Sequence, residues 1–286
     1  MVRDSIRIDD GAGRVLTADR SGLLPVLWTS SEGLDGGLGV RITKTDRLGH
    51  GAVVGALTRP GREITVSGIM HGTDSEAREF IRLLSAMWAG NTRGVLTRNV
   101  DGLELTADDV ILDGPVKLTP TIEDGAATVE WELPLYAGDP LLYGPKRTYR
   151  VSTPSADYGL DWPLFINDEV LTWGSGATTV ATAQIVNSGT VDAYPVITVH
   201  GDFPAGFRVG DGAGRWVAFN RSVTQSAPVV LNFAAHSAAV DGADQSLALT
   251  ERGFWHIPPA GVCSPTLRAI TGGIGYADVA IRDAYL

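Results

Sequence analysis

Acidic residues are the side chains in this sequence that could carry acid–base chemistry. A glycosidase needs one carboxyl group as general acid and another as nucleophile or base, about 5–10 Å apart across a sugar-binding cleft. Two groups of carboxylates could supply such a pair: Asp108, Asp109 and Asp113, or Asp157, Asp161, Asp168 and Glu169. Acidic residues in loops rich in glycine and proline commonly form solvated turns instead. We favour the second interpretation and expect a protein that is not an enzyme and has no catalytic residue.

Metal binding has little support in the sequence. The histidines are scattered, with neither an HExxH motif nor a cysteine pair beside them. They are His50, His71, His200, His236 and His256. Cys263 is the only cysteine, which excludes a disulfide within the chain, and we expect it to be a small buried side chain. We predict neither a metal site nor a cofactor.

Nucleophile and phosphate-binding motifs do not match their required context either. Ser175 stands in Trp-Gly-Ser-Gly, which lacks the spacing of the G-x-S-x-G motif. The glycines at 210, 212 and 214 lie between two predicted strands, whereas a phosphate loop needs a helix N-terminus directly after it.

Two tryptophans in an irregular segment, Trp162 and Trp173, are a better indication of binding. A tryptophan in a loop can stack on a sugar or anchor a partner protein. It can also cover the seam between two domains, and this is the interpretation that we favour.

The composition limits the classes of partner. The chain has 286 residues and a formal net charge of -10, so a protein that grips the phosphates of nucleic acid is disfavoured, as is one that binds anionic membranes. No stretch is apolar over the ~18 residues that cross a bilayer, and the first residues, MVRDSIRIDD, lack the apolar core of a signal peptide. We expect a soluble protein made in a bacterial cytoplasm. Its 35 glycines and 15 prolines favour many short strands.

The first half of the chain combines strands with one helix. Residues 5–9 and 14–18 are predicted to form a hairpin around Asp-Gly-Ala-Gly, a turn whose five-residue form DGAGR recurs at 211–215. Alternation predicts half-buried strands at 39–45 and 62–69. Thr73 and Glu76 form a capping box that starts a helix, and Gly90-Asn91 should end it. Its apolar stripe consists of Ala77, Phe80, Ile81, Leu84, Met87 and Trp88.

Further strands follow the helix. They are expected at 95–98, 103–105, 110–118 and 126–136, the last with alternate residues from Ala127 to Leu135 on a buried face. We therefore predict an N-terminal α+β domain at 1–150, built of β-sheets and one helix.

The second half is predicted to be all β. Its expected strands are 181–186, 194–200, 207–209, 216–220, 229–233, 245–250, 253–257, 265–271 and 276–282. Short strands with turns every eight to twelve residues are typical of a sandwich or jelly roll. We place the domain boundary near Arg150 and assign a β-sandwich to 151–286. The fold class is thus mainly β with one helix.

Three stretches together resemble the distal tail protein family, or Dit, of phages with long flexible tails. They are the run from Arg47 to Gly90, YAGDPLLYGPKRTY at 136–149 and VNSGTVDAYPVITVHGDFP at 186–204. In the third, family members often carry an Asn-x-Gly turn, then Tyr-Pro and a strand that ends in Gly. The segment from Phe254 to Tyr285 is similar as well. The order of these features along most of the chain carries the resemblance.

The resemblance implies a structural protein of the virion tail tip. Its N-terminal belt domain would form a hexameric ring with five other copies, below the tail tube protein. Its C-terminal domain would be a galectin-like sandwich that contacts the tail hub or tail-associated protein and receptor-binding proteins. DNA would be a partner only in transit, and we expect the ring wall to carry more Asp and Glu than Arg so that the duplex slides. The family implies no catalytic residues. A carbohydrate-binding module and a tail-associated glycan hydrolase are the alternatives.

Overall fold

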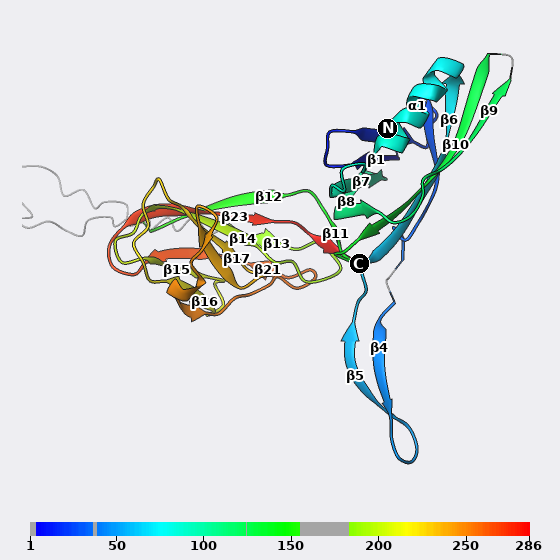
Figure 1. The fold of residues 1–286 in the computed structure, drawn as a ribbon. Helices are drawn as coiled ribbons and strands as arrows, with labels where there is room; N and C mark the ends of the chain where they lie inside the picture. The colour runs from blue at the N-terminus through cyan, green and yellow to red at the C-terminus, as the bar shows by residue number, and fades with distance from the viewer. Residues whose placement is uncertain (1–3, 37–38, 124, 155–182) are drawn as a thin grey trace, which may run out of the picture. The chain divides into compact units, whose positions relative to one another are not determined.

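The structure is a computed structural model that describes residues 4–36, 39–123, 125–154 and 183–286. Within these residues the chain is mainly β-strand with one α-helix, which confirms the predicted fold class (Figure 1). Two compact units are present, Met1–Pro145 with Ala284–Leu286, and Lys146–Asp283. The chain thus returns to the first unit in its last three residues, a feature that the sequence did not indicate.

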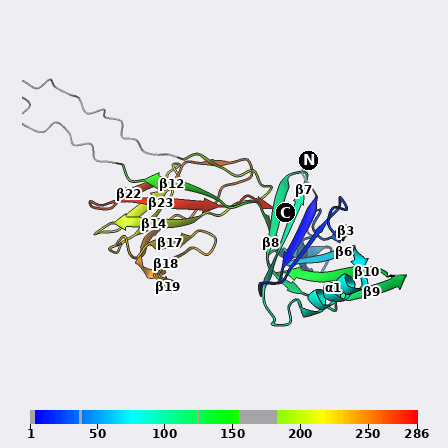
Figure 2. The same cartoon turned by 90° about the horizontal axis from the view of Figure 1, so that it is seen from above.

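A ten-stranded sheet forms the body of the first unit, in the order β24-β11-β8-β7-β1-β2-β3-β6-β10-β9. Its strands are β1 (Ser5–Asp9), β2 (Val15–Asp19), β3 (Val26–Glu32), β6 (Arg62–Thr73), β7 (Gly94–Val100), β8 (Leu103–Leu112), β9 (Lys117–Glu123), β10 (Ala126–Ala137), β11 (Leu142–Tyr143) and β24 (Ala284–Tyr285). Because β8 also pairs with β10, the strands between them close into a circuit around the core. Figure 2 shows this arrangement from above.

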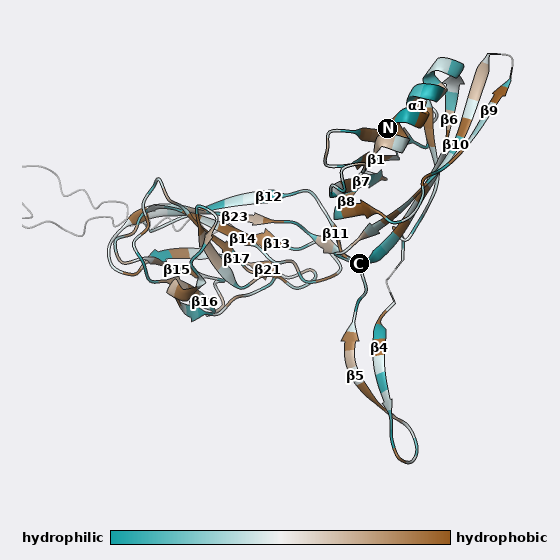
Figure 3. Ribbon diagram, in the orientation of Figure 1, coloured by the Kyte–Doolittle hydropathy of each residue, from teal (hydrophilic) through white to brown (hydrophobic). Residues whose placement is uncertain are grey.

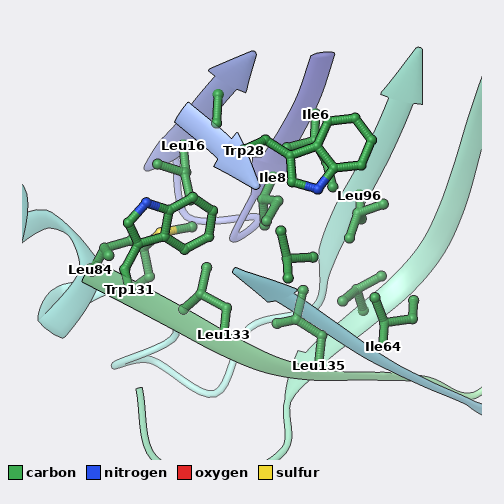
Figure 4. Close-up of a cluster of buried hydrophobic side chains, with 14 of the residues drawn as sticks. Ile6, Ile8, Leu16, Trp28, Ile64, Leu84, Leu96, Trp131, Leu133 and Leu135 are labelled. Carbon is green, nitrogen blue, oxygen red and sulfur yellow. The ribbon is translucent and has the colours of Figure 1, made fainter. Parts of the chain in front are cut away.

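Strands β6 and β10 supply one long wall of that core. They pair antiparallel along their full lengths, from Ala126 opposite Thr73 to Ala137 opposite Arg62. The predicted face of β10 is buried, with Trp131 2% and Leu133 0% exposed. Figure 4 shows both side chains among the other core residues. The alternation in the sequence therefore identified the core side of this strand correctly.

Helix α1 (Asp74–Ala86) begins at the predicted capping box. The Thr73 hydroxyl accepts from the Glu76 N–H at 3.4 Å, and the Glu76 carboxylate accepts from the Thr73 N–H at 2.7 Å. The predicted stop at Gly90-Asn91 is too late, because the helix ends at Ala86. Trp88 has a φ of 57° and its buried indole N–H donates to the Val110 carbonyl at 3.3 Å. Burying this ring turns the chain out of the helix before the glycine is reached.

Strands β4 (Arg41–Asp46) and β5 (Ala52–Thr58) form a separate two-stranded hairpin. We call residues 39–59 the arm (Figures 1 and 3). The prediction of a half-buried strand at 39–45 is wrong, since every residue of β4 and β5 is exposed. The alternation is present in the sequence, but no second layer of the described chain covers either face.

The second unit is a β-sandwich, as predicted for this half. One sheet has the order β12-β23-β14-β17-β18-β19, the other β20-β16-β15-β22, and β13 pairs with β21. Their bounds are β12 (Arg147–Ser152), β13 (Ile185–Val186), β14 (Val196–Asp202), β15 (Phe207–Gly210), β16 (Trp216–Phe219), β17 (Val229–Asn232), β18 (Ser237–Val240), β19 (Ala243–Asp244), β20 (Leu249–Arg252), β21 (Val262–Cys263), β22 (Thr266–Ala269) and β23 (Ile274–Ile281). One apolar core joins the inner faces of both sheets.

Two predicted strands of this unit differ in the structure. At 245–250 a short 3-10 helix, Ser246–Ala248, precedes β20. At 253–257 no strand forms apart from an isolated bridge between Ile257 and Ala193. The reason is aromatic packing, because Trp255 and Phe254 both pack edge-on against the Phe233 ring, with centroids 4.2 and 5.2 Å away.

Candidate assembly surfaces

The carboxylates considered for catalysis lie in open surroundings where the structure describes them. Asp109 and Asp113 are exposed and Asp108 is half-buried. Asp109 forms an ion pair with Arg93 at 3.8 Å, and both side chains face solvent. A glycosidase acid needs a desolvated environment, whereas Asp109 and Asp113 are open to solvent. The second group, Asp157, Asp161, Asp168 and Glu169, lies outside the described residues, as do Trp162, Trp173 and Ser175.

No cluster of three potential metal ligands occurs in the part of the chain that the structure describes. His200 stacks on Tyr276 and His236 on Phe254, with ring centroids 5.0 and 4.9 Å apart. His256 lies 3.5 Å from Asp192. The helix of the described residues is too short and too polar to span a bilayer.

Cys263 is buried in the sandwich core, as expected for a lone cysteine without an activating motif. Its thiol donates to the Asp211 carbonyl at 3.5 Å. Burial, together with the nearby Asp211 carboxylate, raises the pKa of this thiol to about 11. The thiolate is the reactive form of cysteine, so the folded protein holds Cys263 in an inert state.

We expect a thiol reagent such as a disulfide dye to label native protein at pH 8 roughly a hundredfold more slowly than denatured protein. The measurement is the labelling rate by absorbance, with the same chain in guanidinium chloride as the reference. Equal rates in the two conditions would show that Cys263 is exposed in solution.

The repeated DGAGR peptide forms the same turn in each unit. In the first, Asp10 Oδ1 accepts from the N–H groups of Ala12 and Arg14 at 2.8 and 3.0 Å. In the second, Asp211 Oδ1 accepts from Ala213 and Arg215 at 2.8 and 3.0 Å. Both aspartates are buried, at 0% and 5% exposed. The glycines supply the positive φ values that the turn requires, so the sequence assignment of shared turn chemistry is correct.

The arm is the most unusual surface of the first unit. Its exposed apolar side chains are Val40, Ile42, Leu48, Val53, Val54 and Leu57, of which Val54 and Leu57 are 58% and 63% exposed. Its charged side chains are Arg41, Lys44, Asp46, Arg47 and Arg59, so it is basic in a chain of net charge -10. A lone two-stranded hairpin is only marginally stable in water. Exposed apolar strands of this kind mark a surface that another molecule covers.

A second surface is the outer edge of β9. This strand ends the ten-stranded sheet and pairs with β10 alone among the described strands. All of its residues except Leu118 are exposed. An open strand edge offers backbone N–H and C=O groups that can pair with a strand of another molecule. Pro120 has no N–H group, so it cannot donate a hydrogen bond to such a strand.

Comparison by sequence finds no protein-family model and no curated protein that matches the chain. By structure the chain is similar to the SPP1 Dit (gp 19.1) protein, with a TM-score of 0.60 at 17% identity over 98% of this chain and 99% of that chain. This chain has the distal tail protein fold. The resemblance predicted from the three sequence stretches is thereby confirmed at the level of fold.

Two further solved structures are also similar to this chain over nearly its whole length. A chain of the phage P2 baseplate in its activated conformation with Ca matches with a TM-score of 0.51 and 14% identity, over 99% of this chain and 98% of that chain. The same baseplate with Sr gives the same values. The SPP1 protein is described as a paradigm of the hub adsorption apparatus in phages that infect Gram-positive bacteria. Because the likeness covers nearly the whole of each chain, both units of this protein belong to the shared distal tail fold.

Proposed function

We propose that this protein is a structural component of the tail tip of a long-tailed phage, where copies of it form a ring between the tail tube and the host-adhesion apparatus. The observation that carries the proposal is the full-length likeness to a phage hub protein and to a phage baseplate chain. The proposed ring is a homo-hexamer, and the proposed neighbours are the tail tube protein, the hub protein and receptor-binding proteins. The proposal assigns no catalysis, cofactor or metal to the chain.

Two surfaces of the first unit support self-assembly. The arm carries apolar side chains that a neighbouring molecule would bury, and the open edge of β9 can extend a sheet across a subunit boundary. A contact in which different surfaces of two copies meet generates a ring when the rotation between copies closes. An acidic lumen follows as a further expectation, because carboxylates would keep DNA from adhering to the wall.

Negative-stain electron microscopy and mass photometry of the purified chain test the proposal. We expect rings whose population rises with protein concentration. The substitutions Val54→Ser and Leu57→Ser together remove two exposed apolar side chains from the arm and are expected to shift ring assembly to at least about tenfold higher concentration.

The matched control is the pair Leu247→Ser and Ile274→Ser in the second unit, where the two side chains are 92% and 82% exposed. We expect this control to assemble like the natural sequence. A wild-type chain that stays monomeric at all concentrations would refute the ring. If the arm variant and the control variant formed rings equally well, the arm would not be part of the interface, but the proposal of a ring would remain.

A further inference from the structure

The outer face of the four-stranded sheet in the second unit holds an arginine pair on a tryptophan. The Trp216 ring covers Gly210, which has no side chain of its own. A Cβ atom placed on Gly210 would lie 2.8–2.9 Å from three atoms of the indole. These nearly equal distances place the ring flat on the sheet. The guanidinium groups of Arg208 and Arg268 lie 5.0 and 5.5 Å from the centre of that ring. One indole therefore lies within cation–π distance of two guanidinium groups.

This arrangement opposes the stability of the sheet. Arg208 and Arg268 stand directly opposite each other on β15 and β22, and like charges at facing positions are destabilising. Glu251 neutralises only one of them, through an ion pair with Arg208 at 2.7 Å. Arg268 is exposed, and its guanidinium group has no hydrogen bond or ion pair within the described residues. The face therefore keeps an uncompensated positive charge in a chain of net charge -10.

Two polar atoms of the same strands also lack partners. They are Arg208 Nε and the Thr266 hydroxyl, both buried without a hydrogen bond in the described structure. A buried polar atom without a partner costs free energy, so such groups are usually paired. Both atoms are shielded from solvent, so the capacity of this face to bind an anion rests on the exposed guanidinium of Arg268.

We propose that this face binds an acidic polysaccharide, a sugar polymer that carries phosphate, sulfate or carboxylate groups. Guanidinium groups match the geometry of these anions, and the Glu251 carboxylate accepts from sugar hydroxyls. A protein partner fits less well, because protein interfaces need a buried apolar centre. The outward residues here are Arg208, Gly210, Trp216, Ala218, Glu251, Thr266 and Arg268, with Trp216 as the one large apolar side chain. The inference does not depend on ring formation.

Biolayer interferometry on immobilised polymers tests the site. The full chain is passed over dextran sulfate, neutral dextran and poly-glutamate of similar length at ~0.1 M salt, where exposed charges are only partly screened. We expect binding to dextran sulfate, weaker binding to poly-glutamate and none to neutral dextran. The substitution Arg268→Gln should raise the Kd for dextran sulfate about tenfold, as the loss of a charge-assisted hydrogen bond does.

Two further variants separate this site from general charge. Arg268→Lys keeps the charge but loses the planar fork, so its Kd should lie between those of the natural chain and Arg268→Gln. Arg82→Gln on the exposed side of α1 makes the same charge change in the first unit and should leave the Kd unchanged. Neither arginine side chain forms a hydrogen bond or ion pair within the described part of the chain, so each variant is expected to fold.

Three results would overturn the proposal. The first is a chain that does not bind dextran sulfate. The second is an equal effect of Arg268→Gln and Arg82→Gln, which would show that only net charge matters. The third is poly-glutamate binding as tight as that of dextran sulfate, which would assign the face to an acidic protein segment.

Discussion

Replacing Leu84 with Ala is expected to lower the free energy of unfolding of the first unit by about 2–5 kcal/mol, as the truncation of a fully buried leucine does. Leu84 is 0% exposed and lies on the buried face of α1 together with Ala77 and Phe80. The helix packs on β6 and β10, and the Phe80 ring contacts Trp131 edge-on with centroids 6.4 Å apart. A cavity at this position would therefore weaken the contact between the helix and the sheet.

The measurement is hydrogen exchange along β10 as a function of denaturant, which reports the opening free energy of the first unit. Arg82→Ala is the control, since Arg82 is exposed on the same helix and Ala preserves helix propensity. Its effect should stay within about 0.5 kcal/mol. If Leu84→Ala were as mild as Arg82→Ala, the helix would face a partner in solution rather than the sheet.

Replacing Asp10 or Asp211 with Ala is expected to destabilise the unit that contains it by about 1.5–3 kcal/mol, the range for hydrogen bonds to a charged group. Each carboxylate binds two backbone N–H groups of its turn and the guanidinium of the following arginine, Arg14 or Arg215. Without the carboxylate these N–H groups lose their partner inside the turn. Hydrogen exchange along β10 reports the stability of the first unit, and exchange along β14 reports that of the second. Each substitution should affect only its own unit, so each variant is the control for the other.

The same turns predict a dependence of stability on pH. Burial opposes ionisation of both aspartates, but the hydrogen bonds outweigh it, and each pKa lies below its ordinary value. A folded-state pKa below the unfolded one stabilises the protein above the unfolded pKa, and this contribution is lost as the pH falls through the folded value. We expect Asp10→Asn and Asp211→Asn to flatten the fall in stability below pH 4. If stability fell as steeply below pH 4 in both variants as in the natural chain, these carboxylates would not be the cause of the acid sensitivity.

Short-range features were predictable from the sequence because the atoms involved are neighbours along the chain. The capping box needs only Thr73 and Glu76, and the twin turns need only an aspartate and the four residues that follow. The buried face of β10 follows from alternation alone, since side chains of a strand point to opposite sides. The same patterns, taken in order, also indicated the distal tail fold that the structural comparison confirms.

Features that depend on distant partners came only from the tertiary structure. The strand pattern at 39–45 does not show whether a core exists to cover it, and the structure places it in the exposed arm. Arg208 and Arg268 meet because β15 pairs with β22, and Ala284–Tyr285 closes on β11 far back in the chain. Local periodicity determines which side chains share a face. Only the pairing of remote strands decides which faces are buried, and hence which remain available for assembly or binding.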